Sequence, residues 1–163
     1  MPEKKILIVD FDLKSLDSLE KLFERCRIKI IKATDGVSGY EKFKSEKPDL
    51  VILEAMLPKL HGFDLTLKIF RETKGKVPVV IITGVYKGPQ YKNEALRAFG
   101  ASDYFEKPFD SNKLVDSVLS LISEEEDIEE DLPTPDSVIK NLTQMIKDDS
   151  FFRKKEKLSG REK

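Results

Sequence analysis

The chain has 163 residues, of which 29 are lysine or arginine and 30 are aspartate or glutamate, so its formal net charge is −1 at pH 7. This balance gives no general attraction to nucleic acid or to an anionic membrane, and neither partner is expected. The length suits one domain with a core of its own plus an appendage, and a second full domain is not expected.

No apolar run approaches the roughly 20 residues that a membrane span requires. The single cysteine, Cys26, cannot form an internal disulfide. The polar start Met-Pro-Glu-Lys-Lys leads directly into an apolar run, so no signal peptide is expected. The predicted location is therefore a reducing cytoplasm.

Short apolar runs alternate with stretches of helical periodicity, which is the pattern of β/α units around a parallel sheet. An apolar stripe follows each run, and the five resulting units predict an α/β domain of (βα)5 type over residues 1–123. The predicted strands are 5–9, 28–33, 49–53, 78–82 and 103–105. The stripes are Leu16, Leu19, Phe23 and Cys26; Val37, Tyr40 and Phe43; Phe63, Leu67 and Phe70; Ala95, Leu96 and Phe99; and Leu114, Val118, Leu121 and Ile122.

The composition changes at residue 124, where seven acids occur among the eight residues 124–131. Residues 124–134 are therefore predicted to be a solvated, extended acidic linker. Residues 135–163 are predicted to form a short amphipathic helix and a basic, disordered tail. The helix could dock on its own domain, dock on another protein or stay loose, and the sequence does not choose among these.

Polar side chains follow four of the predicted strands. Asp10 follows the first strand, Glu54 the third, Thr83 the fourth and Lys107 the fifth. In a parallel α/β sheet, functional groups gather beyond the carboxyl ends of the strands. We therefore expect these four side chains to lie together at one edge of the sheet, with Lys107 in contact with Glu54 or Asp10.

The four motifs, in this order and spacing, resemble the receiver domains of bacterial two-component response regulators, and the resemblance covers residues 4–123. It implies the flavodoxin-like strand order 2-1-3-4-5 and a signalling module rather than an enzyme. In receivers an aspartate accepts a phosphoryl group, Mg²⁺ bridges the acceptor and the phosphoryl oxygens, and a threonine and a lysine hold the phosphoryl group.

Carried over by motif, the acceptor position holds Glu54, and the two metal-binding acid positions hold Asp10 and Phe11. Thr83 and Lys107 match the hydroxyl and lysine positions. The resemblance also marks three further residues: the backbone carbonyl of Met56 as a metal ligand, Tyr104 as the aromatic switch that reports activation, and Pro108, whose preceding peptide bond is cis in receivers.

Two of these positions depart from the receiver pattern. Phe11 removes a magnesium ligand, and Glu54 moves the carboxylate outward by about 1.5 Å, where a misplacement of about 1 Å can cost about 10²-fold in rate. Glutamate carries a charge near −1 against roughly −1.5 to −2 for a phosphoryl group, so Glu54 could imitate the phosphorylated state by pairing with Lys107 and Thr83. The alternatives are a purely structural partner of Lys107 and a working acceptor.

Other residues have an ordinary interpretation beside a functional one. Asp12 is predicted to cap the following helix, with metal binding as the alternative. Phe11 either fills space or binds a partner, and Tyr104 is either the switch or an ordinary half-buried aromatic. His61 has no accompanying nitrogen or sulfur ligand, which argues against a metal site, and Cys26 is expected to pack in the core.

The resulting hypothesis is a receiver-like signalling module, here called a pseudo-receiver, that acts by protein contact without aspartyl phosphorylation and without a cofactor. Its partner surface is predicted on the face of the fourth helix, fifth strand and fifth helix, or on the helix after residue 135; a homodimer is left open. The alternative is a phosphorylation-dependent response regulator that uses Mg²⁺ in the same pocket. A nucleotide-binding flavodoxin-like protein is disfavoured because no glycine-rich phosphate loop is present.

Overall fold

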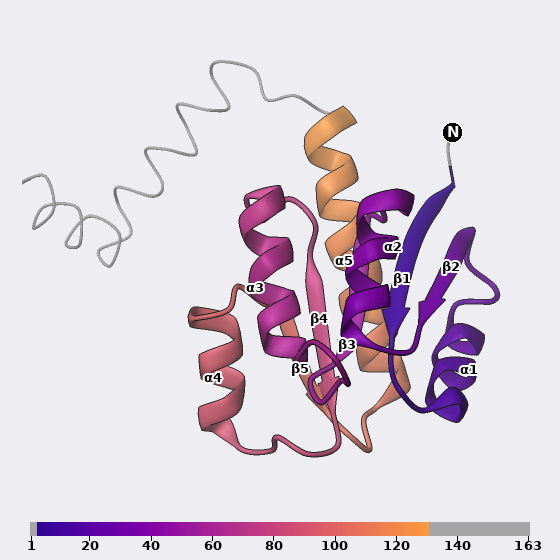
Figure 1. The fold of residues 1–163 in the computed structure, drawn as a ribbon. Coiled ribbons are helices and arrows are strands. Elements are labelled where there is room, and N and C mark those ends of the chain that lie inside the picture. The colour runs from indigo at the N-terminus through magenta and orange to yellow at the C-terminus, as the bar shows by residue number, and fades with distance from the viewer. Residues whose placement is uncertain (1–2, 131–163) are drawn as a thin grey trace, which may run out of the picture. The chain divides into compact units, whose positions relative to one another are not determined.

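A computed structural model of the chain describes residues 3–130, and its core is a five-stranded parallel sheet (Figure 1). The strand order is β2-β1-β3-β4-β5, as predicted. The chain divides into two units, residues 1–123 and 124–163, and the account below concerns the first. The strands are β1 Lys4–Val9, β2 Ile28–Ala33, β3 Leu50–Glu54, β4 Val79–Thr83 and β5 Asp103–Glu106, and the helices are α1 Leu13–Leu22, α2 Gly36–Glu46, α3 Gly62–Thr73, α4 Pro89–Arg97 and α5 Ser111–Glu130.

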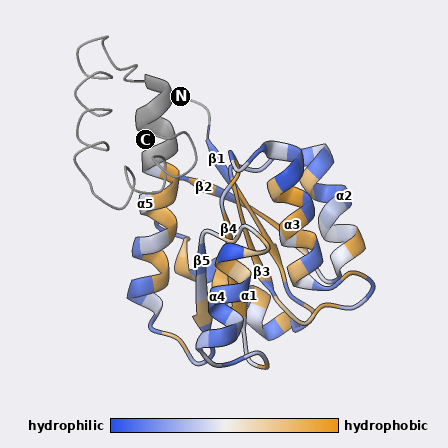
Figure 2. Ribbon diagram, turned by 90° about the vertical axis from the view of Figure 1, so that its left-hand side faces the viewer, coloured by the Kyte–Doolittle hydropathy of each residue, from blue (hydrophilic) through white to orange (hydrophobic). Residues whose placement is uncertain are grey.

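The helices cover both faces of the sheet, so alternate residues of each central strand enter two separate apolar cores. The even-numbered β1 residues Ile6 and Ile8 pack in the core under α1 and α5, and their neighbours Leu7 and Val9 pack in the core under α2, α3 and α4. The three central strands are therefore buried on both sides, which explains their continuous apolar sequences. Figure 2 shows these strands in the colours of hydrophobic residues.

Side chains at the helix starts hold the loops that follow the strands. Asp12 accepts a hydrogen bond from the backbone N–H of Lys14 and caps α1, so the capping prediction is confirmed. Asp35 caps α2 in the same way through the N–H of Ser38. His61 is the cap of α3, with its imidazole accepting from the backbone. These caps fix where each loop leaves the sheet edge.

Two local predictions are wrong. Helix α5 continues to Glu130, so residues 124–130 are helical and not an extended linker; glutamate is a good helix former, and a helix already started gains one hydrogen bond per added residue. Cys26 does not lie on the first helix, which ends at Leu22, although it still packs against the core under α1 and α5. Residues 131–134, the predicted amphipathic helix and the basic tail lie outside the described residues.

None of the described helices combines the length and the apolar character that a membrane-spanning segment needs.

Candidate functional site

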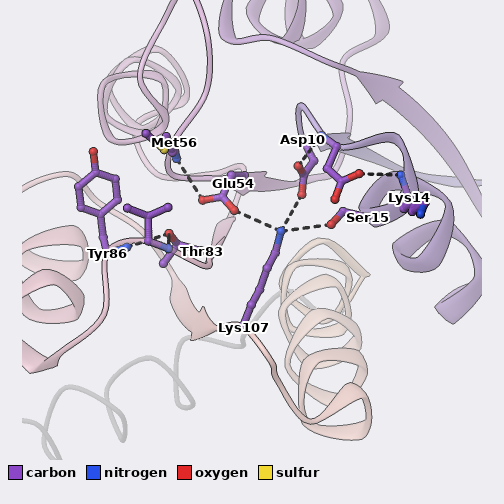
Figure 3. A network of polar contacts seen from close by, with 10 residues as sticks. Asp10, Lys14, Ser15, Glu54, Met56, Thr83, Tyr86 and Lys107 are labelled. Atoms are coloured by element: carbon purple, nitrogen blue, oxygen red, sulfur yellow. Dashed lines mark hydrogen bonds and ion pairs between the residues drawn. The ribbon is translucent and has the colours of Figure 1, made fainter.

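The side chains predicted to meet at one edge of the sheet come from the ends of β1, β3, β4 and β5. Asp10 follows β1, Glu54 ends β3 and Thr83 ends β4, and all three are buried. Lys107 follows β5 and reaches back toward the two carboxylates (Figure 3). The parallel strands thus bring together groups that are up to 97 residues apart in the sequence.

Lys107 lies between the two buried carboxylates, as predicted. Its Nζ is 3.0 Å from Asp10 Oδ2 and 3.2 Å from Glu54 Oε1. A third oxygen, the hydroxyl of Ser15 in α1, lies 3.3 Å away. An ammonium group has three N–H donors, so the lysine has one oxygen neighbour for each. No sequence motif marks Ser15, because only the packing of α1 brings it to this edge.

The remaining carboxylate oxygens are bonded to backbone N–H groups. Asp10 Oδ1 accepts from the N–H of Asp12 at 2.9 Å, and Glu54 Oε2 accepts from the N–H of Met56 at 3.1 Å. Each of the four carboxylate oxygens at the site therefore has a donor within the protein. Charge-assisted hydrogen bonds of this kind hold the side chains in fixed orientations.

The electrostatics of the site reflect this burial. Burial raises the pKa of Asp10, and the N–H of Asp12 and the ammonium of Lys107 only partly offset it. For Lys107, burial would lower the pKa, but the hydrogen bond and charge of Asp10 together with Glu54 outweigh it, so the pKa is raised. The lysine is therefore held in its charged form between the two acids.

A glycine allows the loop after β3 to fold back under Glu54. Gly62 packs so closely against the strand end that an added Cβ would lie 2.4 Å from the carbonyl oxygen of Glu54 and 2.6 Å from Cα of Ala55. The N–H of Gly62 donates to the carbonyl of Ala55 at 2.7 Å, which closes the loop. No side chain fits there, so this position fixes the path of residues 55–61.

Half of the surface of Phe11 is exposed, and Phe11 is not among the described side chains that pack on either apolar core. Half of the side chain is therefore available for contact with a partner, and both interpretations of Phe11, filling space and binding, stay predictions. Met56, whose carbonyl was the expected metal ligand, also exposes 46% of its surface. Leu13, the first residue of α1, and Val85, in the loop after β4, are also exposed, so exposed apolar side chains lie on the segments that follow β1, β3 and β4 at this edge. Exposed apolar groups that gather in this way are typical of binding surfaces.

Thr83 is engaged with the loop after β4 and makes no hydrogen bond to Glu54 among the described residues, so the expected pairing of the two is not observed. Its Oγ1 accepts from the N–H groups of Val85 and Tyr86, at 3.0 and 3.2 Å. Tyr104 is buried, not half-buried, and its hydroxyl donates to the carbonyl of Tyr86 at 2.5 Å. The peptide bond before Pro108 is cis, as the receiver resemblance implied.

Two other kinds of possible site are a metal centre and a surface hollow. Among the described residues no cluster of three or more His, Cys, Asp or Glu side chains could hold a metal ion. A hollow of about 570 Å³ lies on the face of α4, β5 and α5, and its lining includes Lys92, Phe105, Phe109 and Lys113. This is the face predicted to bind a partner.

Comparison with known proteins gives a consistent family. Residues 6–119 match the sequence pattern described as the response regulator receiver domain. The chain is 33% identical over 138 residues to the alkaline phosphatase synthesis transcriptional regulatory protein PhoP of Bacillus subtilis (strain 168), covering 85% of this chain and 54% of that protein. It is 28% identical over 120 residues to protein PilH of Pseudomonas aeruginosa, covering 73% of this chain and 98% of that protein. The chain spans about half the length of several other curated relatives it matches.

Solved structures agree. The chain is similar to a CheY-like response regulator receiver domain protein from Methanospirillum hungatei JF-1, with a TM-score of 0.69, 28% identity, and coverage of 77% of this chain and 98% of that one. The receiver domain of the Francisella response regulator 1452 gives a TM-score of 0.67 with 30% identity, over 74% of this chain and 98% of that one.

Proposed function

The chain belongs to the response regulator receiver domain family of two-component signalling, and we propose that it is a pseudo-receiver that signals by protein contact without phosphorylation at the acceptor position. Receiver domains are signalling modules and generally not enzymes, and no catalytic role is proposed for any residue of this chain. The observation that carries the proposal is the pair of internal partners of Glu54, an ion pair with Lys107 and a hydrogen bond from the N–H of Met56.

These partners support the proposal because they leave neither Glu54 oxygen without an internal donor. Oε1 lies against Lys107 and Oε2 accepts from the N–H of Met56. Attack on a phosphoryl donor would have to come from an oxygen whose charge is already stabilised by one of these donors inside a buried site, which lowers its tendency to form a new bond. Lys107, the residue expected to hold a phosphoryl group, is bonded to the acids themselves.

The donor set also does not fit magnesium. Mg²⁺ requires oxygen ligands in near-octahedral geometry, usually from one or two carboxylates plus water. Here Phe11 offers no oxygen, and both oxygens of Asp10 already accept hydrogen bonds, from Asp12 and Lys107. A cation would have to compete with the ammonium of Lys107, which lies 3.0 Å from Asp10. We therefore propose that the single charge of Lys107 partly offsets the two carboxylates in place of a metal ion.

Glu54 holds the domain in one signalling state, because its carboxylate forms an ion pair with Lys107 without any phosphorylation. Its single charge is smaller than that of a phosphoryl group, and Thr83 is bonded to the loop after β4 instead. A full imitation of the phosphorylated state is therefore less well supported than a fixed ion pair. In either case the output does not depend on a phosphodonor.

Intact-mass measurement after incubation with acetyl phosphate and Mg²⁺ tests the proposal. We expect no added phosphoryl group on the natural chain. The matched control is the double variant Phe11→Asp, Glu54→Asp, in which the acceptor and the missing acid are both restored and about one phosphoryl group is expected. Stable addition of one phosphoryl group to the natural chain would establish the phosphorylation-dependent alternative instead.

The partner surface is proposed on the face of α4, β5 and α5, where the hollow is lined by apolar and charged side chains. A pull-down with the whole chain and with the charge-reversal variant Lys113→Glu tests this. A protein that the natural chain captures should be lost with the variant and kept with the control Lys68→Glu, which changes an exposed lysine of α3. Equal capture by all three chains would exclude this face.

A further inference from the structure

Tyr86, in the loop between β4 and α4, contacts three parts of the domain at once. Its N–H donates to Thr83 Oγ1 at 3.2 Å, and its carbonyl accepts the hydroxyl of Tyr104 at 2.5 Å. Its own hydroxyl lies 3.2 Å from Nε2 of His61, in the loop between β3 and α3. One residue therefore joins the site, the buried aromatic of β5 and the loop that follows Glu54.

The hydrogen bonds of His61 define its protonation pattern. Nδ1 accepts from the backbone N–H of Phe63 at 3.1 Å, which caps α3. A neutral imidazole that accepts at Nδ1 carries its proton on Nε2. Nε2–H is then the donor to the hydroxyl oxygen of Tyr86. Both ring nitrogens are in use, one for the helix cap and one for the contact with Tyr86.

Aromatic packing keeps these groups in place. The ring of His61 meets the rings of Phe63 and Tyr86 edge-on, with centroids 5.2 and 5.3 Å apart. The ring of Tyr86 also meets Tyr91 edge-on at 5.4 Å, and Phe63 lies 6.4 Å from Tyr104. Aromatic pairs at such separations add to the energy of burial and restrict the ring orientations. The backbone carbonyl of Tyr86 accepts the hydrogen bond from the Tyr104 hydroxyl. Its position is therefore stabilised by the contacts that His61 makes with the side chain of Tyr86.

We propose that His61 is a positioning residue of this domain. Through its bond to Tyr86 it holds the loop between β4 and α4 in the conformation that keeps Tyr104 buried. The conformation of the α4, β5 and α5 face then depends on the loop between β3 and α3 as well as on the pocket around Glu54. This inference goes beyond the proposed function and holds whether or not Glu54 accepts a phosphoryl group.

Two substitutions remove the hydrogen bond between His61 and Tyr86 and leave most of the aromatic packing around it in place. Tyr86→Phe removes the hydroxyl and keeps the ring and the backbone. His61→Asn keeps an oxygen that can cap α3 but no longer reaches Tyr86. A net hydrogen bond of about 1 kcal/mol corresponds to about a fivefold change in an equilibrium. Each variant should therefore raise the population of chains with Tyr104 exposed about fivefold.

The measurement is ¹⁹F NMR of the full chain labelled with 3-fluorotyrosine. The Tyr104 resonance is assigned by its loss in Tyr104→Phe. The population with Tyr104 exposed is then measured from chemical exchange between the buried and exposed conformations. Both substitutions remove the same hydrogen bond. When Tyr86→Phe is already present, adding His61→Asn should therefore leave the population with Tyr104 exposed almost unchanged. Tyr40→Phe is the matched control, since it removes a phenol bond to Glu72 elsewhere, and it should leave the resonance unchanged.

An unchanged Tyr104 resonance in Tyr86→Phe would overturn the proposal, even if His61→Asn proved too unstable to measure. Independent, multiplying effects of the two substitutions would also overturn it. The experiment uses no phosphodonor, metal or partner protein. Its outcome is therefore separate from that of the acetyl phosphate test.

Discussion

Replacing Lys107 by methionine removes the only described cation that contacts either buried carboxylate of the site. The side chains of Asp10 and Glu54 are 1% and 3% exposed, so water cannot take over the role of the ammonium. In a medium of effective dielectric constant about 20, unit charges 3.0 and 3.2 Å apart attract by roughly 5 kcal/mol each. The cost of desolvating the ammonium opposes this gain, and breaking a buried ion pair typically costs about 3–5 kcal/mol.

We therefore expect Lys107→Met to lower the free energy of unfolding at pH 7 by about 3–5 kcal/mol. The measurement is urea unfolding followed by circular dichroism. Lys14→Met is the matched control, because it removes an exposed lysine on the same edge that makes no ion pair within the described residues, and its effect should stay within about 0.5 kcal/mol. Adding Glu54→Gln to Lys107→Met should recover part of the loss by removing one of the two uncompensated charges.

The loss should also depend on pH. Burial already raises the pKa of Asp10 in the natural chain, and in the variant this carboxyl loses the ammonium that partly offsets the rise, so its pKa in the folded state lies further above that in the unfolded state. A group with a raised pKa stabilises the fold below its unfolded pKa and loses that contribution as the pH rises through the folded value. The deficit relative to the natural chain should therefore be largest near neutral pH and shrink on acidification toward about pH 4. A variant within about 1 kcal/mol of the natural chain, or a deficit independent of pH, would refute the reasoning.

Three further predictions address metal binding, the buried tyrosine and the loop after β3. The double variant Phe11→Asp, Glu54→Asp should bind Mg²⁺ in calorimetry while the natural chain does not; absence of binding by the variant would mean that the site is wrongly aligned. Burial, and after it the charge of Glu106, raises the pKa of Tyr104 to about 12. The contribution of this residue to stability should therefore be complete below about pH 10 and be lost as the pH rises through about 12. Comparing the alkaline unfolding of the natural chain with that of Tyr104→Phe tests this. Gly62→Ala places a Cβ 2.4 Å from a backbone oxygen and should cost about 2 kcal/mol or more in thermal unfolding; a variant as stable as the natural chain would show that the loop can move aside.

Much of this architecture could be predicted because its signals are local. The apolar runs of the strands identify a sheet buried on both faces, and right-handed crossovers leave few ways to order it. The side chains Asp10, Glu54 and Lys107 could be predicted to meet, because each follows a strand and parallel strands end at one edge. The cap at Asp12 follows from the preferences of a single residue type.

Other features depended on packing between distant segments. Ser15 reaches Lys107 only because α1 lies beside the end of β1, and the sequence around it gives no sign of this. The exposure of Phe11 depends on where its loop turns, since an apolar residue after a strand can face either the core or the solvent. The bond between His61 and Tyr86 joins two loops 25 residues apart in sequence.

Sequence periodicity therefore determined the strands and helices, because it reflects the burial of each element; the resemblance to receiver domains implied the strand order, and the residues after the strands gave the polar groups at the sheet edge. Only the tertiary structure decided which donor satisfies each carboxylate oxygen, and hence that Glu54 has Lys107 and Met56 as its internal partners. Hydrogen bonds act over about 3 Å, whereas a strand assignment places a side chain only to the nearest edge of the sheet. The hydrogen bonds and ion pairs of this site are therefore decided at a precision that a strand assignment does not reach.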